Sequence, residues 1–314
     1  MTGILTITVN PALDFSTEAP AVIPDQKLRC SSPEIHPGGG GVNVSRAIAN
    51  LGGQSRPLLA YGGPTGDMLA ELLKEEGLRP EPLGVSYSTR QSVSVRDGAN
   101  GLQYRFMLPG HDWSEADVST ARETIEGAIE PGDLVIPSGS FPPGLDEDFF
   151  LTLAPVVAAR GGRMILDTSG AALEHACQTP SEIYVLRMDL AEAREASQRS
   201  LVGLEDIATL ASEFREKSGA EIVMIAAGAT GNVICCDAWR GLTRPPVVVP
   251  ISAIGAGDSF IGAFAMSLVR GEDPVTACSW GTAAAASAVT RGGTVLCDRP
   301  ETEAFFQQVT RVEL

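Results

Sequence analysis

Short apolar runs alternate with helical patterns along most of the chain. The runs are rich in β-branched residues and lie at 4–9, 133–137, 163–167, 183–186 and 221–226. Apolar residues at helical spacing lie between them, for example at 68–73 and 204–214. This alternation predicts an α/β fold with a mostly parallel central sheet and helices on both faces. Ligands of such sheets bind at the carboxyl ends of the strands.

Two stretches break this alternation. Residues 92–95 and 103–106 alternate apolar and polar side chains around the turn-forming sequence Asp-Gly-Ala-Asn-Gly at 97–101, which predicts a β-hairpin. Residues 14–34 lack helical spacing and contain three prolines. We expect this segment and the segment at about 90–109 to form a small β-sheet lid over one edge of the ligand cleft.

Composition restricts the class of protein. The 314 residues suffice for one α/β domain with a small appendage, and no repeat or linker divides them, so we expect a single domain over 1–314. The net charge of −16 argues against nucleic acid or an acidic membrane as partner. The N-terminus lacks signal-peptide features and no apolar run is long enough to span a membrane, which predicts a cytoplasmic protein. Six cysteines without a CxxC pair and three scattered histidines indicate neither a disulfide framework nor a zinc site.

The sequence Gly-Ala-Gly-Asp at 255–258 stands directly before an apolar helical run. Free N–H groups at a helix start bind anions, and small residues let an anion approach the backbone. Gly255, Ala256 and Gly257 would then bind an anionic group while Asp258 acts as base on the attacking nucleophile. These are the groups that phosphoryl transfer to an alcohol requires. The simpler interpretation is an ordinary helix start with an acidic first turn.

Four glycines at 38–41 precede a second predicted helix, more than a simple turn needs. This run favours a surface where a polyhydroxylated ligand lies against the backbone, with Asn43 and Asp14 offering an amide and a carboxylate to its hydroxyls.

Together, the glycine run at 38–53 and the Gly-Ala-Gly-Asp sequence at 255–258 resemble the two signatures of the ribokinase-like, or PfkB, carbohydrate kinase family. The resemblance extends over essentially the whole chain and includes the sequences at 10–14, 138–144 and 167–170. It implies a three-layer α/β sandwich with a small β-sheet lid, ATP as co-substrate and Mg²⁺ as cofactor, with K⁺ as a further candidate ion.

The resemblance also implies residue roles. Asp258 would be the catalytic base, and Gly255, Ala256 and Gly257 the anion hole for the transferred γ-phosphate. The sugar would contact Asp14, Gly39, Gly40, Asn43 and Ser138.

The family's Asn-x-x-Glu motif, which organises magnesium, is Asp-Leu-Ala-Glu at 189–192 in this chain. The added charge of Asp189 should repel the ATP phosphates unless magnesium or Arg187 compensates. Glu192 is the expected magnesium ligand. The residues expected on the nucleotide side are Asp189, Glu192, Ala227, Gly228, Thr230 and Gly231, with the purine near Ala284 and Ser287.

A phosphorylated substrate needs cations to bind its phosphate. The candidates Lys27, Arg90 and Arg105 lie in or beside the predicted lid, where the alternative is that they are solvated surface charges. Within the family their sequence context resembles the sugar-phosphate kinases, most closely the minor-type 6-phosphofructokinase branch. Gly40 stands where the fructose-1-phosphate and tagatose-phosphate branches usually carry Lys.

The expected substrates are therefore ATP and fructose 6-phosphate, phosphorylated at its 1-hydroxyl. The alternatives are a 1-phosphofructokinase, a tagatose-6-phosphate kinase, or a sugar-phosphate sensor that has lost turnover. The family also implies a homodimer formed through the lid.

Overall fold

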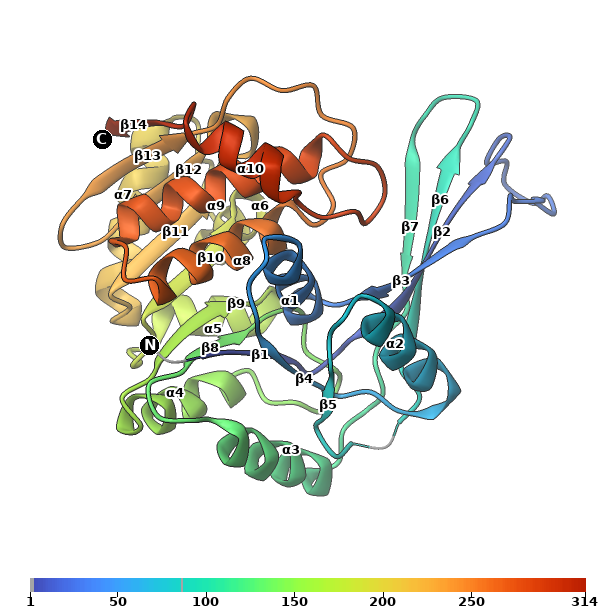
Figure 1. Cartoon of the computed structure of the whole chain (residues 1–314), viewed down its shortest axis with the longest axis horizontal. Coiled ribbons are helices and arrows are strands. Elements are labelled where there is room, and N and C mark those ends of the chain that lie inside the picture. Colours follow the sequence, from blue (N-terminus) through green and yellow to red (C-terminus); the bar gives the residue numbers. More distant parts are fainter. Residues whose placement is uncertain (1–2, 86) are drawn as a thin grey trace.

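A ten-stranded sheet forms the middle of the molecule in this computed structural model, which describes residues 3–85 and 87–314 (Figure 1). The strand order is β14-β13-β12-β11-β10-β9-β8-β1-β4-β5. The seven strands from β11 to β5 pair in parallel, and β12, β13 and β14 join the edge in antiparallel pairs. The strands are β1 (Ile4–Thr8), β4 (Arg56–Leu59), β5 (Glu81–Pro82), β8 (Leu134–Pro137), β9 (Arg163–Asp167), β10 (Val185–Asp189), β11 (Ile222–Ala226), β12 (Asn232–Cys235), β13 (Arg240–Arg244) and β14 (Thr310–Glu313).

Helices cover both faces of this sheet. One face carries α1 (Gly40–Asn50), α8 (Ala256–Val269) and α9 (Pro274–Val289). The other carries α3 (Glu115–Ala128), α4 (Phe149–Ala159), α5 (Gly170–Gln178), α6 (Leu190–Ser197) and α7 (Leu204–Ser218). The remaining helices are α2 (Gly63–Glu75) and α10 (Arg299–Phe306), and α10 packs on α9. The predicted three-layer α/β sandwich with a mostly parallel sheet is confirmed.

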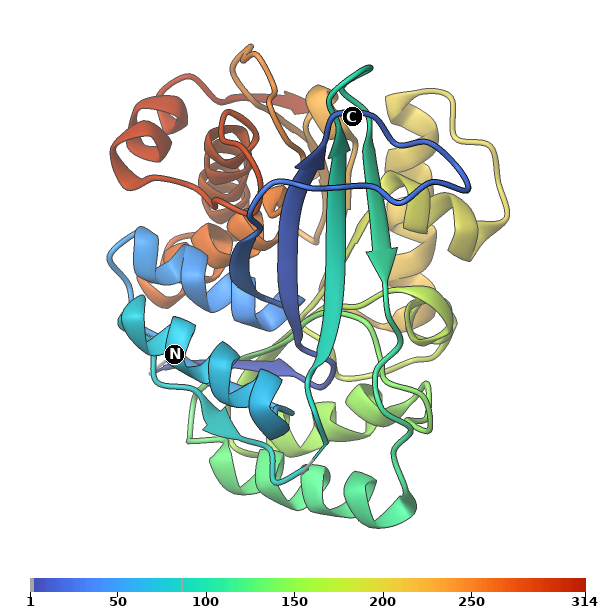
Figure 2. The ribbon, with the colours of Figure 1, turned by 90° about the vertical axis from the view of Figure 1, so that its right-hand side faces the viewer.

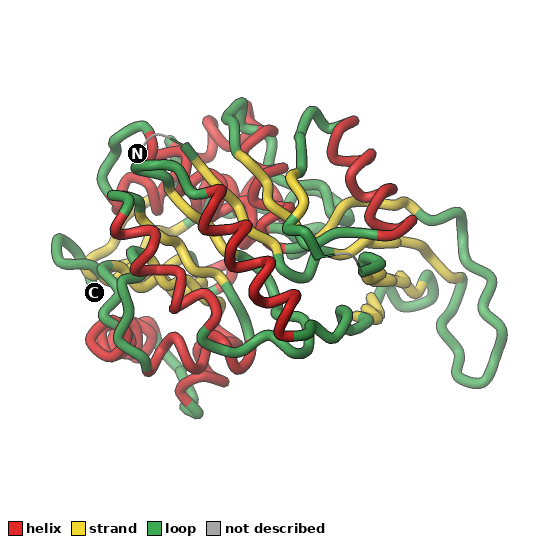
Figure 3. The backbone as a smooth tube through the Cα atoms, turned by 90° about the horizontal axis from the view of Figure 1, so that it is seen from below, coloured by secondary structure: helices red, strands yellow, loops and turns green. Residues whose placement is uncertain are grey.

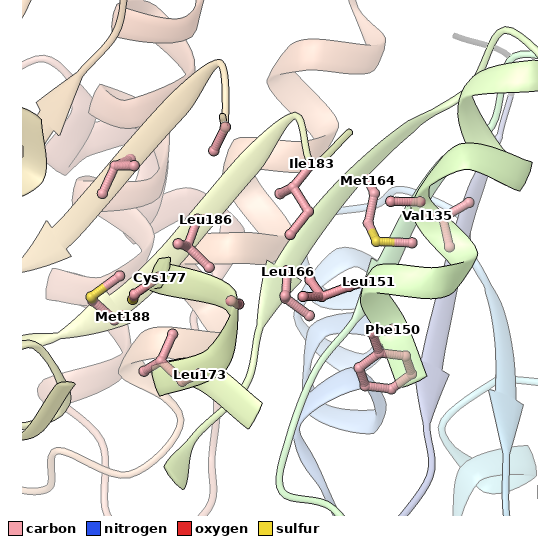
Figure 4. Packing of buried hydrophobic residues seen from close by; sticks show 14 of the residues in the cluster. Val135, Phe150, Leu151, Met164, Leu166, Leu173, Cys177, Ile183, Leu186 and Met188 are labelled. Atoms are coloured by element: carbon pink, nitrogen blue, oxygen red, sulfur yellow. The ribbon is translucent and has the colours of Figure 1, made fainter. Parts of the chain in front are cut away.

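Alternate residues of the central strands point into the two helix layers. In β9, Met164 and Leu166 belong to the cluster around α4, where Figure 4 shows them beside Phe150 and Leu151, whereas Ile165 belongs to the cluster on the α8 side. Because both faces are buried, a central strand reads as a continuous apolar run. That is why the pattern of the sequence predicts these strands.

A second, smaller sheet extends from the body, with its loops at the far end (Figures 1, 2 and 3). Its order is β3-β2-β6-β7, formed by β2 (Ala12–Ala19), β3 (Glu34–Gly38), β6 (Arg90–Asp97) and β7 (Gln103–Met107). The hairpin of β6 and β7 is as predicted. β2 pairs antiparallel with β3 and parallel with β6. We call these four strands the lid.

The pairing register of the lid strands places polar side chains on one face of this sheet. Asp14 of β2 pairs with Ser92 of β6, and Arg105 of β7 pairs with Ser94 of β6. Directly paired residues point to the same face and side chains two apart along a strand share it, so these four lie together. The polar face therefore offers a carboxylate, hydroxyls and a guanidinium.

The opposite face of the lid is apolar. Phe15 pairs with Val93, which pairs with Phe106, and Val95 pairs with Tyr104. The base of this face packs on α2, since Phe15 contacts the cluster of Leu13, Leu69 and Leu73. Toward the tip it is open, with Phe106 53% exposed and Tyr104 38% exposed.

A glycine lets α8 pack closely against α1. A Cβ on Gly262 would lie 3.0 Å from the Cβ of Ala47 and 3.2 Å from the carbonyl oxygen of Val44. The absence of a side chain at this position therefore allows the first turns of the two helices to meet. None of the helices within 3–85 and 87–314 has the length and hydrophobicity needed to cross a bilayer.

Candidate active site

Polar residues gather where neighbouring parallel strands end. Asn10 follows β1, Ser138 follows β8, Asp167 ends β9, Asp189 ends β10 and the loop at 227–231 follows β11. In parallel strands all of these ends lie at one edge of the sheet, which is where ligands of α/β folds bind. The first turns of α1 and α8 reach the same edge.

The glycine run places the start of α1 against the loop after β8. The backbone at Gly39 has φ 119°, which favours glycine. A Cβ on Gly40 would meet the hydroxyl of Ser138 and lie 2.7 Å from the backbone nitrogen of Gly139. The backbone N–H of Gly41 donates to the carbonyl oxygen of Ser138 at 3.2 Å. The structure thus brings Gly39, Gly40 and Ser138 together.

The start of α8 forms an anion-binding position. Gly255 caps the helix with φ 74°, and the helix begins at Ala256. The first N–H groups of a helix have no acceptor within it, so those of Gly257 and Asp258 are available to an anion. A Cβ on Gly257 would lie 2.9 Å from both terminal nitrogens of Arg187. A guanidinium therefore lies directly against this helix start and adds a positive charge to it.

Asp258 is held between α1 and the strand ends. The Asn43 amide donates to a carboxylate oxygen of Asp258 at 3.0 Å. Burial raises the pKa of Asp258 to about 7, and the neighbouring carboxylate of Asp167 acts in the same direction. The hydrogen bond from Asn43 and the charges of Arg187 and Arg46 oppose this rise in pKa. A carboxyl group with a pKa near 7 suits a general base at neutral pH.

Asp167 connects the two sides of the site. One of its oxygens accepts from Arg187 at 2.9 Å and the other from the hydroxyl of Ser138 at 2.7 Å. Within the described part of the chain, the buried Nε of Arg187 has no acceptor. No role is predicted for Asp167 from the sequence. Its place at the end of the apolar strand 163–167 is the signal that could have identified it.

Asp189 and Glu192 form a capping box at the start of α6. A carboxylate oxygen of Asp189 accepts from the backbone N–H of Glu192 at 2.9 Å, and Glu192 accepts from the backbone N–H of Asp189 at 2.7 Å. Asn and Asp are comparably good N-caps because each supplies a side-chain oxygen, so the exchange of Asn for Asp keeps this geometry. Burial raises the pKa of Glu192 to about 7, and Asp189 and Asp167 also raise it.

The donor set at this position is compatible with Mg²⁺. Among residues 3–85 and 87–314, no group of three or more His, Cys, Asp or Glu side chains forms a metal site made of protein ligands alone. Mg²⁺ commonly takes one or two carboxylates together with substrate phosphates and water. Glu192 uses only one carboxylate oxygen in the capping box, so its other oxygen is available to such an ion.

The loop after β11 forms an exposed turn. Gly228, Ala229 and Thr230 make a short 3₁₀ turn, closed by a hydrogen bond of 2.8 Å from the N–H of Ala227 to the carbonyl oxygen of Gly231. The turn follows Ala226, which pairs with Asp189. The residues expected at the nucleotide loop thus lie next to the start of α6.

Two residues expected near the purine lie inside the protein. Ala284 and Ser287 of α9 are both 0% exposed. The hydroxyl of Ser287 donates to Glu301 at 2.7 Å and accepts from the N–H of Asp298 at 3.1 Å, so it stabilises the junction with α10. The expectation that these two residues contact the purine is wrong for this structure, because neither presents surface to a ligand.

The lid brings two of the three expected cations to Asp14. Burial raises the pKa of Asp14, while the charges of Arg90 and Arg105 lower it, which places both guanidinium groups near this carboxylate. Arg90 also donates to the carbonyl oxygens of Asn10 at 3.2 Å and Leu108 at 3.1 Å, so it ties the base of the lid together.

Lys27 is not brought to this group. It lies exposed in the connection between β2 and β3, and no hydrogen bond or ion pair joins it to another residue of the described chain.

A buried carboxyl group beside a helix start and a guanidinium, at the strand ends of a three-layer α/β fold, is the arrangement expected of an alcohol phosphotransferase. The comparisons with known proteins agree. The pfkB family carbohydrate kinase model matches residues 3–302, and the chain belongs to this family.

Named relatives cover almost the whole chain. The ATP-dependent 6-phosphofructokinase isozyme 2 of Mycobacterium tuberculosis is 34% identical over 97% of this chain and 89% of its own length. The protein of the same name from Escherichia coli strain K12 is 33% identical over 99% of this chain and 100% of its own. A 1-phosphofructokinase of Xanthomonas campestris is 27% identical over 88% of this chain and 87% of its own.

Solved structures show the same fold. Phosphofructokinase-2 from Escherichia coli in complex with potassium matches with a TM-score of 0.91 at 33% identity, covering 98% of this chain and 99% of that one. The structure of that enzyme in complex with fructose-6-phosphate matches with a TM-score of 0.89 over the same shares.

The pKa of Asp258 predicts how the stability of the protein depends on pH. The folded pKa lies above the unfolded value, so this carboxyl group contributes stability below about pH 4 that is lost as the pH rises through about 7. Asp258→Asn should therefore raise the free energy of unfolding at pH 8, and the gain should disappear toward pH 4. One pKa unit corresponds to about 1.4 kcal/mol, and since Asp258 keeps some solvent exposure we expect a gain of about 1 kcal/mol or more.

Denaturant titrations of both proteins at pH 4.5, 6 and 8 measure this difference. The exposed carboxylate of Asp146 provides a control, because Asp146→Asn should produce no comparable gain at pH 8. A difference between Asp258→Asn and the wild type that is constant across these pH values would contradict the assignment.

Proposed function

We propose that this protein is an ATP-dependent 6-phosphofructokinase that transfers the γ-phosphoryl group of ATP to the 1-hydroxyl of fructose 6-phosphate. The observation that carries the proposal is the position of Asp258, whose pKa lies near 7, at a helix start lined by Arg187. The relatives named for this activity, at 33% and 34% identity, support the choice of substrate.

Gly40 favours this activity over the 1-phosphofructokinase and tagatose-6-phosphate kinase alternatives. Those branches usually carry Lys at the corresponding position. A Cβ at position 40 would meet Ser138 and Gly139, so the site accommodates no side chain there without a shift of the β8 loop. The named 1-phosphofructokinase is also less similar to this chain, at 27% identity.

The proposed reaction is an in-line transfer. Asp258 takes the proton of the 1-hydroxyl as its oxygen bonds to the γ-phosphorus, and the bond from that phosphorus to the bridging oxygen of ADP breaks. The N–H groups of Gly257 and Asp258, together with Arg187, stabilise the charge on the transferred group. Asp167 holds Arg187 in place.

The substrates are assigned to the two sides of this centre. Asp14, Gly39, Gly40, Asn43 and Ser138 bind the sugar, and Arg90 and Arg105 bind its 6-phosphate. Asp189 and the loop at 227–231 lie on the nucleotide side. Glu192 would hold Mg²⁺, which when bound supplies positive charge to the ATP phosphates.

The base role predicts the kinetics of Asp258→Asn. We expect kcat to fall by roughly 10² to 10⁴ with little change in substrate binding, because the variant keeps the hydrogen bond to Asn43 but cannot take a proton. A coupled assay with fructose 6-phosphate and Mg-ATP, together with calorimetric binding of the sugar phosphate, measures both quantities. Turnover close to that of the wild type would remove Asp258 from this role.

The phosphate contact predicts a selective effect of Arg105→Ala. Arg105 makes no hydrogen bond to another described residue, so its loss should disturb the lid less than the loss of Arg90. A charge-assisted contact to phosphate is worth about 1.5 to 3 kcal/mol, so kcat/KM for fructose 6-phosphate should fall roughly 10- to 150-fold.

Turnover of unphosphorylated fructose and the KM for ATP should hardly change in Arg105→Ala. Arg96→Ala, at the far end of β6, is the matched control and should leave kcat/KM within a few-fold. Equal losses with fructose and fructose 6-phosphate would mean that Arg105 shapes the lid and does not bind the phosphate.

We also propose a homodimer in which the apolar faces of two lids pack together. Phe106 and Tyr104 form an open patch on that face, and such patches in a soluble protein mark interaction sites. Sedimentation should show a dimer at micromolar concentration, and Phe106→Asp should dissociate it because a carboxylate would be buried without a partner. Arg122→Asp on α3, away from the lid, is the control. A monomeric wild type would contradict this proposal.

A further inference from the structure

Arg46 is a buried arginine that connects its own helix to two neighbouring elements. It lies on α1 and is 7% exposed. Its Nε and one terminal nitrogen donate to the two carboxylate oxygens of Glu76, at the end of α2, at 2.6 and 2.8 Å. Its other terminal nitrogen donates to the carbonyl oxygen of Pro37 in β3 at 3.3 Å and to the side-chain oxygen of Asn43 at 3.2 Å.

The contact with Asn43 determines which end of that amide faces the base. A side-chain amide has one oxygen, which accepts, and one nitrogen, which donates. Because Arg46 can only donate, it binds the oxygen, and the nitrogen is then the end that reaches Asp258 at 3.0 Å. The reversed amide would set its oxygen against the carboxylate of Asp258 and its nitrogen against the guanidinium. Both contacts would be repulsive.

Glu76 determines where Arg46 can point. A bidentate pair between a guanidinium and a carboxylate fixes the plane of the guanidinium. The contact with Pro37 adds the lid strand β3 to the same group. Because Glu76 and Pro37 both hold the guanidinium of Arg46 in place, the hydrogen bond from Arg46 leaves the Asn43 amide little freedom to rotate.

The groups that most strongly shift the pKa of Asp258, besides its burial, come from three elements. They are Asn43 and Arg46 from α1, Asp167 from β9 and Arg187 from β10. Arg46 is the member of this set that lies outside the cleft, because it is covered by Glu76 and Pro37. Its effect on the base therefore does not require contact with substrate.

We propose that Arg46, held by Glu76, is a positioning residue that orients the amide nitrogen of Asn43 toward the carboxylate of Asp258. This inference rests on the proposed role of Asp258 as the base. It adds two residues, 30 positions apart in the chain, to the groups on which the proposed reaction depends.

The test compares Arg46→Met with Arg46→Lys and Glu76→Gln in pH profiles of kcat/KM for fructose 6-phosphate. Arg46→Met removes a positive charge and frees the amide, which raises the pKa of Asp258. Since the base must be deprotonated, the acidic limb should move to higher pH by roughly 0.5 to 1 unit, and kcat/KM at pH 7 should fall roughly two- to sixfold from this shift alone. Arg46→Lys keeps the positive charge but loses the planar guanidinium that binds Glu76 and Asn43 together. The acidic limb of the pH profile should therefore move less than in Arg46→Met, while kcat still falls because the Asn43 amide is no longer held.

Glu76→Gln should move the acidic limb in the opposite direction. Removing the carboxylate leaves the charge of Arg46 uncompensated, which lowers the pKa of Asp258. The Gln side chain still accepts one hydrogen bond, so this variant also tests the proposal if Arg46→Met fails to fold.

Arg56→Met is the matched control for loss of a structural arginine. Arg56 begins β4 at the opposite edge of the sheet, where it donates to the carbonyl oxygen of Ala128 and pairs with the fully buried Asp133. Its removal should lower thermal stability and leave the acidic limb in place. The phosphate of the substrate titrates near pH 6 in all variants, so each shift is measured relative to this control.

The outcomes separate this inference from the proposed function. If Arg46→Met and Glu76→Gln lose stability but keep the acidic limb of the control, Arg46 is only structural and the inference is overturned. If Asp258→Asn turns over fructose 6-phosphate at the wild-type rate, Asp258 is not the base and the premise of this inference is wrong. If the wild-type protein transfers no phosphoryl group to fructose 6-phosphate, the proposed function itself is wrong.

Discussion

The carboxylate of Asp258 can occupy its position only because α1 and α8 pack closely. Gly262 permits this approach, and the first turns of the two helices then meet at the carboxyl edge of the sheet. At that edge the amide of Asn43 reaches Asp258, and the helix start of α8 presents its free N–H groups beside Arg187. The packing of apolar faces far from the edge thus determines the geometry of the charged groups.

Balanced charges make this arrangement tolerable. Two carboxylates, Asp167 and Asp258, lie near each other, and their repulsion would be costly without Arg187 and Arg46. Each guanidinium is itself fixed by a carboxylate, Arg187 by Asp167 and Arg46 by Glu76. Burial therefore keeps the pKa of Asp258 near 7 without leaving an isolated charge inside the protein.

The parts of the fold that follow from local pattern could be predicted from the sequence. Central strands such as β9 are apolar throughout because both of their faces are covered, and the β6–β7 hairpin alternates because its two faces differ. The strands β4, β5, β12, β13 and β14 were not predicted because each is only two to five residues long, and β13 and β14 also carry arginines. β13 forms a hairpin with β12, whereas β14 pairs with β13 from the far C-terminal end of the chain.

Only those parts of the site that depend on a local sequence pattern could be predicted from the sequence. The glycine runs require close approach of backbone, and that requirement is visible in the sequence. Ala284 and Ser287 were placed by resemblance alone, and their small side chains serve close packing between helices. The contact of Arg46 with Glu76 joins residues of two helices, and no local pattern reveals it.

The site around Asp258 is proposed to phosphorylate fructose 6-phosphate at its 1-hydroxyl. The most direct measurement follows a mixture of equal amounts of fructose 6-phosphate, fructose 1-phosphate and tagatose 6-phosphate with limiting Mg-ATP, with products identified by phosphorus NMR. We expect fructose 1,6-bisphosphate formed by consumption of fructose 6-phosphate, with the other two sugars largely unused. Preferential consumption of fructose 1-phosphate or tagatose 6-phosphate, or no transfer to any of the three, would contradict it.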